Sequence, residues 1–325
     1  MNRINKALSM ALFVLTVGVA LAASGTAWAK HARPSGSEGP DPTAVSTCGT
    51  LNLSDTIYYL TANLTETGTG TCITLSGSHS GLNLYGYSIT GPDTATSKTS
   101  AGYGIEITGT MDVVQGFDAT ISGFLAGVYD NGTQIFGDDL NFTGNVTGLL
   151  VGSRGHTHDW SNLTAYSNFG NGLWFDGCAD DCFLSDSSTY DNALDGLLVQ
   201  GTSGFNASVL IASDNTTNGI ELGGTGDNAN SDAHVADVFI TGLTWLNPPY
   251  YAVSGNTENG ILLDSGETED QITTIYAKGN GNGTTYFDLH DANTTCGTDL
   301  WYNNTFTTSR AGSTSTPACI HGMGD

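Results

Sequence analysis

A short apolar pattern recurs along most of this chain. A glycine is followed by residues whose first and third positions are mostly Val, Ile, Leu or Phe, as in Gly148-Leu-Leu-Val and Gly172-Leu-Trp-Phe. Alternation with a period of two is typical of a strand with one face buried. The intervals between successive glycines are 23, 21, 24, 24, 23 and 41 residues, for Gly104, Gly127, Gly148, Gly172, Gly196, Gly219 and Gly260. The pattern therefore predicts a chain of strand-containing repeats.

An asparagine keeps step with this glycine. Asn145, Asn168, Asn192, Asn215 and Asn256 each lie three or four residues before such a glycine. Apolar residues also alternate three and five residues before these asparagines, so each repeat holds at least two short strands joined by turns. A unit this small cannot bury its apolar face alone. Stacked units would bury a continuous core and let the turn asparagines hydrogen-bond along the stacking axis.

These features predict an all-β fold: a single-stranded right-handed parallel β-helix, or solenoid, with coils of about 23 residues and disulfide-closed ends. Leucine-rich repeats have a similar period, but their consensus leucine ladder is missing from this sequence.

The two ends of the chain differ from the repeats. Residues 1–29 are predicted to be a signal peptide, because a positive start and an apolar run precede the small-x-small motif Ala27-Trp28-Ala29. Residues 30–47 are rich in Pro, Gly and Ser, which indicates a flexible leader. We expect the β-helix over 48–295 and a C-terminal cap and tail over 296–325. The protein is predicted to be extracellular or periplasmic, and no membrane insertion is expected, since no later apolar run approaches roughly 18 residues.

Six cysteines fit an oxidising compartment, where disulfides persist. Sequence alone leaves about 15 pairings open. We favour Cys48–Cys72, Cys178–Cys182 and Cys296–Cys319, which would close both ends of the domain and pin one loop. A cysteine-based zinc site is the alternative, although the spacings match no zinc ribbon or finger.

The charge of the mature chain is strongly negative. Without the signal peptide, six basic residues face 32 acidic ones, a formal charge of −26. Such a field repels nucleic acid and anionic membranes, so no nucleic-acid partner is expected. It also disfavours polyanions such as pectate or alginate unless bound cations bridge the two. One explanation of the charge is solubility in an acidic or saline habitat, and calcium binding is the alternative. The sequence names no cofactor, and Ca²⁺ is the candidate.

Two segments resemble a known family. The segment CITLSGSHSGLNLYGYSITG at 72–91 and the segment VVQGFDATISGFLAGVYDNG at 113–132 resemble the opening coils of secreted right-handed parallel β-helix repeat proteins. This pectin-lyase-like superfamily also contains alginate epimerases and carbohydrate-binding/sugar-hydrolase modules. The resemblance covers roughly residues 48–310 and implies the fold. It implies little about function, because one fold hosts many activities.

The same resemblance extends to the end of the chain but not to catalytic motifs. The segment 296–319 is similar to the C-terminal cap of these proteins, which would cover the open strand edges of the last coil. Asp138-Asp139 followed by Gly155-His156 is similar to the order in pectin hydrolases. The downstream Arg-x-Lys of those enzymes and the Asp-Pro-His of alginate epimerases are both missing, so neither activity is carried over.

Candidate binding residues lie at the second and fourth positions after the repeat glycine, which should face outward. The middle coils place Tyr129 and Trp174 there, beside Asn131, Asp176 and Gln200. Aromatic faces beside amides and carboxylates suit sugar rings, which have apolar faces and a rim of hydroxyls. The alternative is that this row lies under a loop or forms a contact between subunits.

Candidate catalytic residues lie in two loops that would stack about 4.8 Å apart. They are Arg154 and His156 in one loop and Asp176, Asp180 and Asp181 in the next. Asp176 with Asp180 or Asp181 could supply the acid and base of glycoside hydrolysis. His156 or Arg154 could instead abstract or stabilise a proton in a lyase or epimerase reaction.

A third possibility for the same loops is a metal site. His156 and His158 form an H-x-H pair, which in an extended segment places both imidazoles on one face, and Asp159 adds a carboxylate. Against this, a single exposed H-x-H usually binds no metal tightly.

The sequence thus predicts a secreted carbohydrate-active or carbohydrate-binding β-helix protein, similar to polysaccharide lyases or hydrolases, whose partner is a polysaccharide or cell-surface glycan. The alternative is a non-catalytic extracellular surface, matrix or adhesion protein. The sequence does not indicate the oligomeric state.

Overall fold

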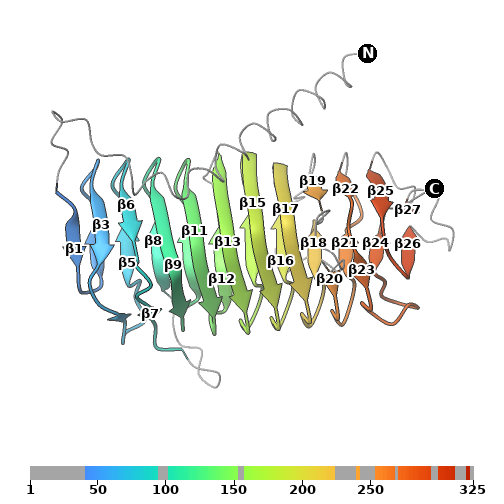
Figure 1. Ribbon diagram of the computed structural model, residues 1–325, viewed down its shortest axis with the longest axis horizontal. Helices are drawn as coiled ribbons and strands as arrows, with labels where there is room; N and C mark the ends of the chain where they lie inside the picture. The colour runs from blue at the N-terminus through green and yellow to red at the C-terminus, as the bar shows by residue number, and fades with distance from the viewer. Residues whose placement is uncertain are drawn as a thin grey trace, which may run out of the picture. The chain divides into compact units, whose positions relative to one another are not determined.

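The repeats stack into a right-handed parallel β-helix of about nine turns, spaced about 24 residues apart. A computed structural model of the 325-residue chain describes residues 41–93, 102–152, 157–223, 239–241, 253–267, 270–293, 299–311 and 320–322. Within these residues the strands follow one another side by side in chain order, and there is no helix (Figure 1). The predicted fold class is confirmed.

Two parallel sheets run along the solenoid. Sheet B has eleven strands among the described residues: β2 (Gly49–Leu51), β5 (Ile73–Leu75), β8 (Tyr103–Ile107), β10 (Ala126–Asp130), β12 (Thr147–Val151), β14 (Leu173–Asp176), β16 (Leu197–Gln200), β18 (Ile220–Leu222), β21 (Ile261–Leu263), β24 (Leu289–Asp291) and β26 (Ser309–Ala311). These strands begin at or near the repeat glycines, so sheet B is the ladder that the sequence predicts.

Sheet A contains the remaining sixteen strands of the described residues. Its main path is β1 (Thr43–Val45), β3 (Ile57–Leu60), β6 (Gly81–Asn83), β9 (Val113–Ser122), β11 (Phe136–Thr143), β13 (His158–Tyr166), β15 (Ala179–Tyr190), β17 (Ser203–Ser213), β19 (Phe239–Thr241), β22 (Gln271–Thr273), β25 (Leu300–Asn304) and β27 (Ile320–Gly322). Beside this path lie β4 (Leu64–Thr65), β7 (Ile89–Thr90), β20 (Val253–Ser254) and β23 (Ala277–Lys278).

Four long strands of sheet A, β11, β13, β15 and β17, each bend at one residue. Asp139, Asn162, Asp186 and Val209 have φ angles of 62°, 51°, 49° and 57°, in the left-handed region. The bend shifts the alternation of buried residues by one: in β13 the side chains of His158 and Trp160 point inward before Asn162, and those of Leu163 and Ala165 do so after it. Each of these coils therefore has three straight segments, one in sheet B and two in sheet A.

The repeat glycine is needed because successive coils touch there. A Cβ atom on Gly172 would lie 2.7 Å from the carbonyl oxygen of Gly196, and one on Gly196 would lie 2.6 Å from that of Gly219. The same carbonyl of Gly196 accepts a hydrogen bond from the backbone N–H of Leu173 at 2.9 Å. A side chain at this position would thus push apart the coils that the sheet holds together.

The predicted asparagine ladder is confirmed. The side-chain Nδ2 of Asn168 donates to Asn192 Oδ1 at 3.0 Å, and Asn192 donates to Asn215 at 2.9 Å. Asn215 donates to Asn256 at 3.0 Å, and Asn256 to Asn280 at 2.8 Å. Each Nδ2 also donates to a backbone carbonyl of the preceding coil, such as Ala165 for Asn192. The ladder therefore ties each turn to the coils on both sides.

The ladder ends on an acidic residue. The backbone N–H and the Nδ2 of Asn280 both donate to Asp288 Oδ1 at 3.0 Å. The other carboxylate oxygen of Asp288 accepts the N–H groups of Thr307 and Thr308. A row of amides that all donate in one direction needs an acceptor at its end, and an ionised carboxylate supplies acceptors only.

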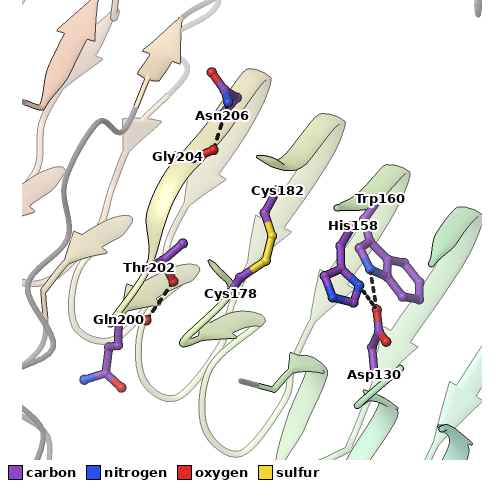
Figure 2. Close-up of a disulfide and its surroundings, with 9 residues drawn as sticks. All are labelled: Asp130, His158, Trp160, Cys178, Cys182, Gln200, Thr202, Gly204 and Asn206. Carbon is purple, nitrogen blue, oxygen red and sulfur yellow. Dashed lines mark hydrogen bonds and ion pairs between the residues drawn. A yellow bond between two sulfur atoms is a disulfide. The ribbon is translucent and has the colours of Figure 1, made fainter. Parts of the chain in front are cut away.

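Two coils place an aspartate where the others place an apolar core residue. Asp130 and Asp291 end their sheet B strands and are fully buried. Asp130 Oδ2 accepts the indole N–H of Trp160 at 3.1 Å, and Asp291 Oδ2 accepts that of Trp301 at 3.1 Å. Figure 2 shows Trp160 and His158 both directed at Asp130. The aspartates thus join the two sheets across the interior, and each indole N–H is satisfied there.

Two of the three predicted disulfides are present, and strands lie in the segments expected to be the leader and the cap. Cys48–Cys72 and Cys178–Cys182 are bonded as predicted, whereas Cys296 and Cys319 lie outside the described residues. Strand β1 lies within the segment expected to be a flexible leader, yet it pairs in parallel with β3. At the other end, β25, β26 and β27 lie in the expected cap and extend both sheets.

We expect Asn192→Leu to lower the free energy of unfolding by about 3–5 kcal/mol, because it leaves several buried N–H and C=O groups without partners at about 1–3 kcal/mol each. Urea denaturation followed by tryptophan fluorescence measures this. The matched control is Asn141→Leu, since that side chain lies at the surface and makes one hydrogen bond, to the carbonyl of Asp118. Equal losses for both variants would contradict a stabilising role for the ladder.

Candidate functional site

The outward side chains of sheet B form a continuous row. Backbone register places Tyr129 opposite Leu150, Leu150 opposite Trp174, and Trp174 opposite Leu198. The row continues through Glu221, Leu262 and His290 to Arg310, and in the other direction Glu106 lies opposite Tyr129. We call these nine side chains the sheet B row. Most of them are half-buried by their neighbours, so they form a surface rather than isolated projections.

The aromatic end of the sheet B row is well packed. The rings of Tyr103 and Tyr129 lie 4.6 Å apart between centroids, at an interplanar angle of 40°. Trp174 follows after Leu150, two coils further along. Both predicted aromatic residues therefore belong to one surface, separated by a single aliphatic side chain, which is an arrangement that can stack against successive sugar rings.

The predicted polar partners lie along one edge of this surface. Asp176 and Gln200 end β14 and β16 and are paired in register. Asn131 follows β10 directly, and its backbone N–H donates to the carbonyl of Ile107. Asp176 is exposed, while Asn131 and Gln200 are half-buried. Partial burial raises the pKa of Asp176 above its usual value.

The other predicted catalytic residues cannot be placed beside Asp176. Arg154 and His156 lie outside the described residues, and of Asp180 and Asp181 only the backbone is described, within β15. The backbone register of β15 is irregular between Ala179 and Cys182, so the pairing of this segment with β17 shifts there.

His158 is not where the sequence prediction put it. Instead of lying in an exposed loop, it is fully buried, and its Nδ1 lies 2.7 Å from Asp130 Oδ2 (Figure 2). Asp159 is the next residue of the same strand and faces the other way, because successive residues of a strand alternate. His158 and Asp159 therefore do not meet, and the described residues contain no group of three or more His, Cys, Asp or Glu side chains arranged to hold a metal ion.

The sequence prediction missed a carboxyl pair on sheet B. Asp195 occupies the position just before the repeat glycine, where the neighbouring coils have Asn171 and Asn218. Its Oδ1 accepts Thr217 Oγ1 at 2.5 Å and the backbone N–H of Asn218 at 2.9 Å. The Nδ2 of Asn218 donates both to Asp195 Oδ1 at 3.1 Å and to Glu221 Oε2 at 2.7 Å. Asn218 thus bridges the two carboxyl groups.

This pair holds a proton at neutral pH. Burial, then the charges of Asp195 and Asp264, raise the pKa of Glu221 to about 8. The burial comes from Leu198 and Leu262, which flank Glu221 in the sheet B row. Burial also raises the pKa of Asp195, although the bonds from Thr217 and Asn218 offset part of that effect. Because those donors favour a charged Asp195, Glu221 is the carboxyl of the pair whose protonated form burial favours.

The far end of the sheet B row carries the only described cation of this face. The guanidinium carbon of Arg310 lies 5.9 Å from the centroid of the Phe287 ring. His290 lies between Leu262 and Arg310 in the row. Burial, and then the charge of Arg310, lower the pKa of His290, so its imidazole is neutral at pH 7.

A signal for the missed pair is present in the sequence, but it is short. The residue before the repeat glycine is Asn171, Asn218 or Asn259 in three coils and Asp195 in the fourth. Glu221 lies at the outward second position after the repeat glycine Gly219. The link between Asp195 and Glu221 through Asn218 joins two successive coils, and it can be recognised only when the register of those coils is known.

Comparisons with known proteins agree on the fold. No family model matches the chain, and no curated protein matches it. Among solved structures, the Dettilon tailspike protein has a TM-score of 0.58 at 12% identity, over 82% of this chain and 53% of the tailspike, so the chain spans about half of that protein. Pectate lyase Pel9A has a TM-score of 0.51 at 16% identity, over 80% of this chain and 71% of the lyase. A mutant of the periplasmic alginate epimerase AlgG has a TM-score of 0.50 at 11% identity, over 83% of this chain and 74% of the epimerase.

These neighbours share the right-handed parallel β-helix, which is the fold that the sequence resemblance implies. In the part of the chain that the structure describes, no helix is long and apolar enough to cross a membrane.

We expect Glu221→Gln to flatten the dependence of stability on pH. The pKa of Glu221 is 4.5 in the unfolded chain and about 8 in the folded chain, so unfolding releases a proton at any pH between these values. The contribution of the Glu221 carboxyl to the free energy of unfolding is therefore complete below pH 4.5 and is lost as the pH rises through 8. Urea midpoints at pH 5, 7 and 9 measure the difference between wild type and variant. Glu66→Gln, beside β4, is the control, and a Glu221→Gln profile parallel to wild type would contradict the raised pKa.

Proposed function

We propose that this protein is a secreted, carbohydrate-active β-helix that binds a glycan chain along the sheet B row. The observation that carries the proposal is the in-register placement of Tyr129, Leu150 and Trp174 on one outward face. Rings and aliphatic groups on this surface suit the C–H faces of successive sugars, and Asn131 and Gln200 at its edge suit their hydroxyls.

The neighbours in fold support the class but not a particular substrate. Their names refer to pectate and to alginate, both polysaccharides. The identities are only 11–16%, so a carbohydrate ligand for this chain is our proposal and does not follow from those names alone. The two disulfides support an oxidising compartment and hence secretion.

The carboxyl pair adds a chemical role to the surface. Glu221 keeps its proton at neutral pH and lies in the same row as Trp174, one residue beyond Leu198. We extend the proposal to hydrolysis of the bound glycan, with Glu221 as the general acid. Asp195 is joined to Glu221 through the Nδ2 of Asn218, so we assign it the role of holding the Glu221 carboxyl in position. The charge of Asp264 also acts on Glu221, and we propose Asp264 as the second of the two carboxyl groups that glycoside hydrolysis uses.

Trp174→Ala should weaken glycan binding about tenfold or more, because the stacking surface is lost. A glycan array followed by titration calorimetry with the best ligand measures this. Phe117→Ala is the matched control, since Phe117 is 50% exposed and lies on sheet A instead. Failure of the wild type to bind any glycan, or equal affinities for wild type and Trp174→Ala, would refute the proposal.

Glu221→Gln should lower depolymerisation of the bound glycan by about 100-fold or more, because a general acid contributes that much, while binding is retained. Reducing-end release, measured between pH 5 and 9, reports the rate. Cleavage by Glu221→Gln at the wild-type rate would remove Glu221 from the reaction. Binding without cleavage by the wild type would instead favour a non-catalytic extracellular adhesion or matrix protein.

A further inference from the structure

The charges around the sheet B row limit what kind of glycan it can hold. Glu106 lies directly opposite Tyr129, and Asp176 lies at the edge beside Trp174. Asp195, Asp264 and Glu258 surround Glu221 closely enough to raise its pKa. Along the middle of this face the described charged groups are therefore acidic.

Cations are scarce on the described part of the molecule. Lys278 and Arg310 are the two described basic residues. Lys278 ends β23 in sheet A, and Arg310 lies at the far end of the sheet B row, beyond His290. Recognition of a carboxylate on a sugar normally uses Arg or Lys, or a bridging metal ion. Between Glu106 and Leu262 the described residues place neither a basic side chain nor a metal-binding cluster.

Besides its carboxylates, this face offers uncharged hydrogen-bonding groups. Asn131 and Gln200 are amides, and the protonated Glu221 is a neutral donor and acceptor. Such groups match sugar hydroxyls, which need no counter-charge. The formal charge of the whole chain, −24, adds a long-range repulsion for any polyanion.

We infer that the glycan bound by the sheet B row is uncharged, and that this face discriminates against polyuronates such as pectate and alginate. This inference rests on the proposed function, because it concerns the ligand of the same surface. An uncharged ligand would give this chain a different class of substrate from the neighbours whose names refer to pectate and alginate.

The test compares glycans that carry negative charge with glycans that carry none. Polygalacturonate and its full methyl ester share one backbone, and neutral glucans, xylans, mannans and galactans widen the uncharged set. The complete secreted chain is titrated with each in EDTA, at low and at high salt. We expect at least one uncharged glycan to bind at least tenfold more tightly than any polyuronate. Added salt should narrow this gap, because it screens the repulsion.

A charge reversal on the face supplies the second arm. Glu106→Lys should increase polyuronate affinity about tenfold, because it replaces a repulsive charge beside Tyr129 with an attractive one. Glu66→Lys is the matched control: Glu66 is also half-buried and its replacement changes the net charge equally, but it follows β4 of sheet A. Thermal unfolding verifies that both variants fold. If Glu106→Lys does not fold, Glu106→Gln replaces it, with a smaller expected gain in polyuronate affinity.

The outcomes distinguish the inference from the function on which it rests. Polyuronate binding that depends on Trp174 and matches the best uncharged glycan would overturn the inference and leave the binding function intact. Polyuronate binding of that strength only with added calcium would overturn it in the same way. Equal gains from Glu106→Lys and Glu66→Lys would show that net charge, not this face, discriminates. No binding of any glycan, or binding indifferent to Trp174→Ala, would overturn both the function and the inference.

Discussion

The amide ladder is the interaction on which the rest of this β-helix depends. Every asparagine from Asn145 to Asn256 donates to the next one along the axis and also to a backbone carbonyl of the coil before it. All the donors point the same way, so the spacing and the register of neighbouring coils are set together. Asp288 ends the row because it only accepts. The glycine column beside the ladder lets the coils approach closely enough for these bonds to form.

The candidate site follows from this register. The residues of the sheet B row come from different coils, and they become neighbours only because successive strands pair residue for residue. One substitution within a second row of amides then changes the chemistry. Where the other coils have Asn171, Asn218 and Asn259, the coil before β16 has Asp195, which places a carboxylate beside Glu221. A stabilising row and a proton-holding pair are therefore parts of the same structure.

The interior is less apolar than the strand pattern suggests, and this explains the main error in the predicted site. Two aspartates occupy inward positions, each satisfied by a tryptophan indole of the opposite sheet. His158 lies beside one of them, although in the sequence it stands in a polar stretch that resembles a surface loop. A polar residue inside a β-helix is stable when its partner is also inside, and the partner of His158 is Asp130, which lies 28 positions earlier in the sequence.

The sequence by itself determined the repeat, the strand positions, the asparagine ladder and two of the disulfide pairings, because these arise from a pattern that recurs every coil. It also placed Tyr129 and Trp174 on one outward face, since alternation within a strand and the glycine register together define that face. Only the tertiary structure decided that His158 is buried, that Asp159 faces away from it, and that Asn218 joins the carboxyls of Asp195 and Glu221. Those facts depend on contacts between particular side chains of different coils, and a repeat pattern records where a residue lies within its own coil but not which side chain it meets in the next.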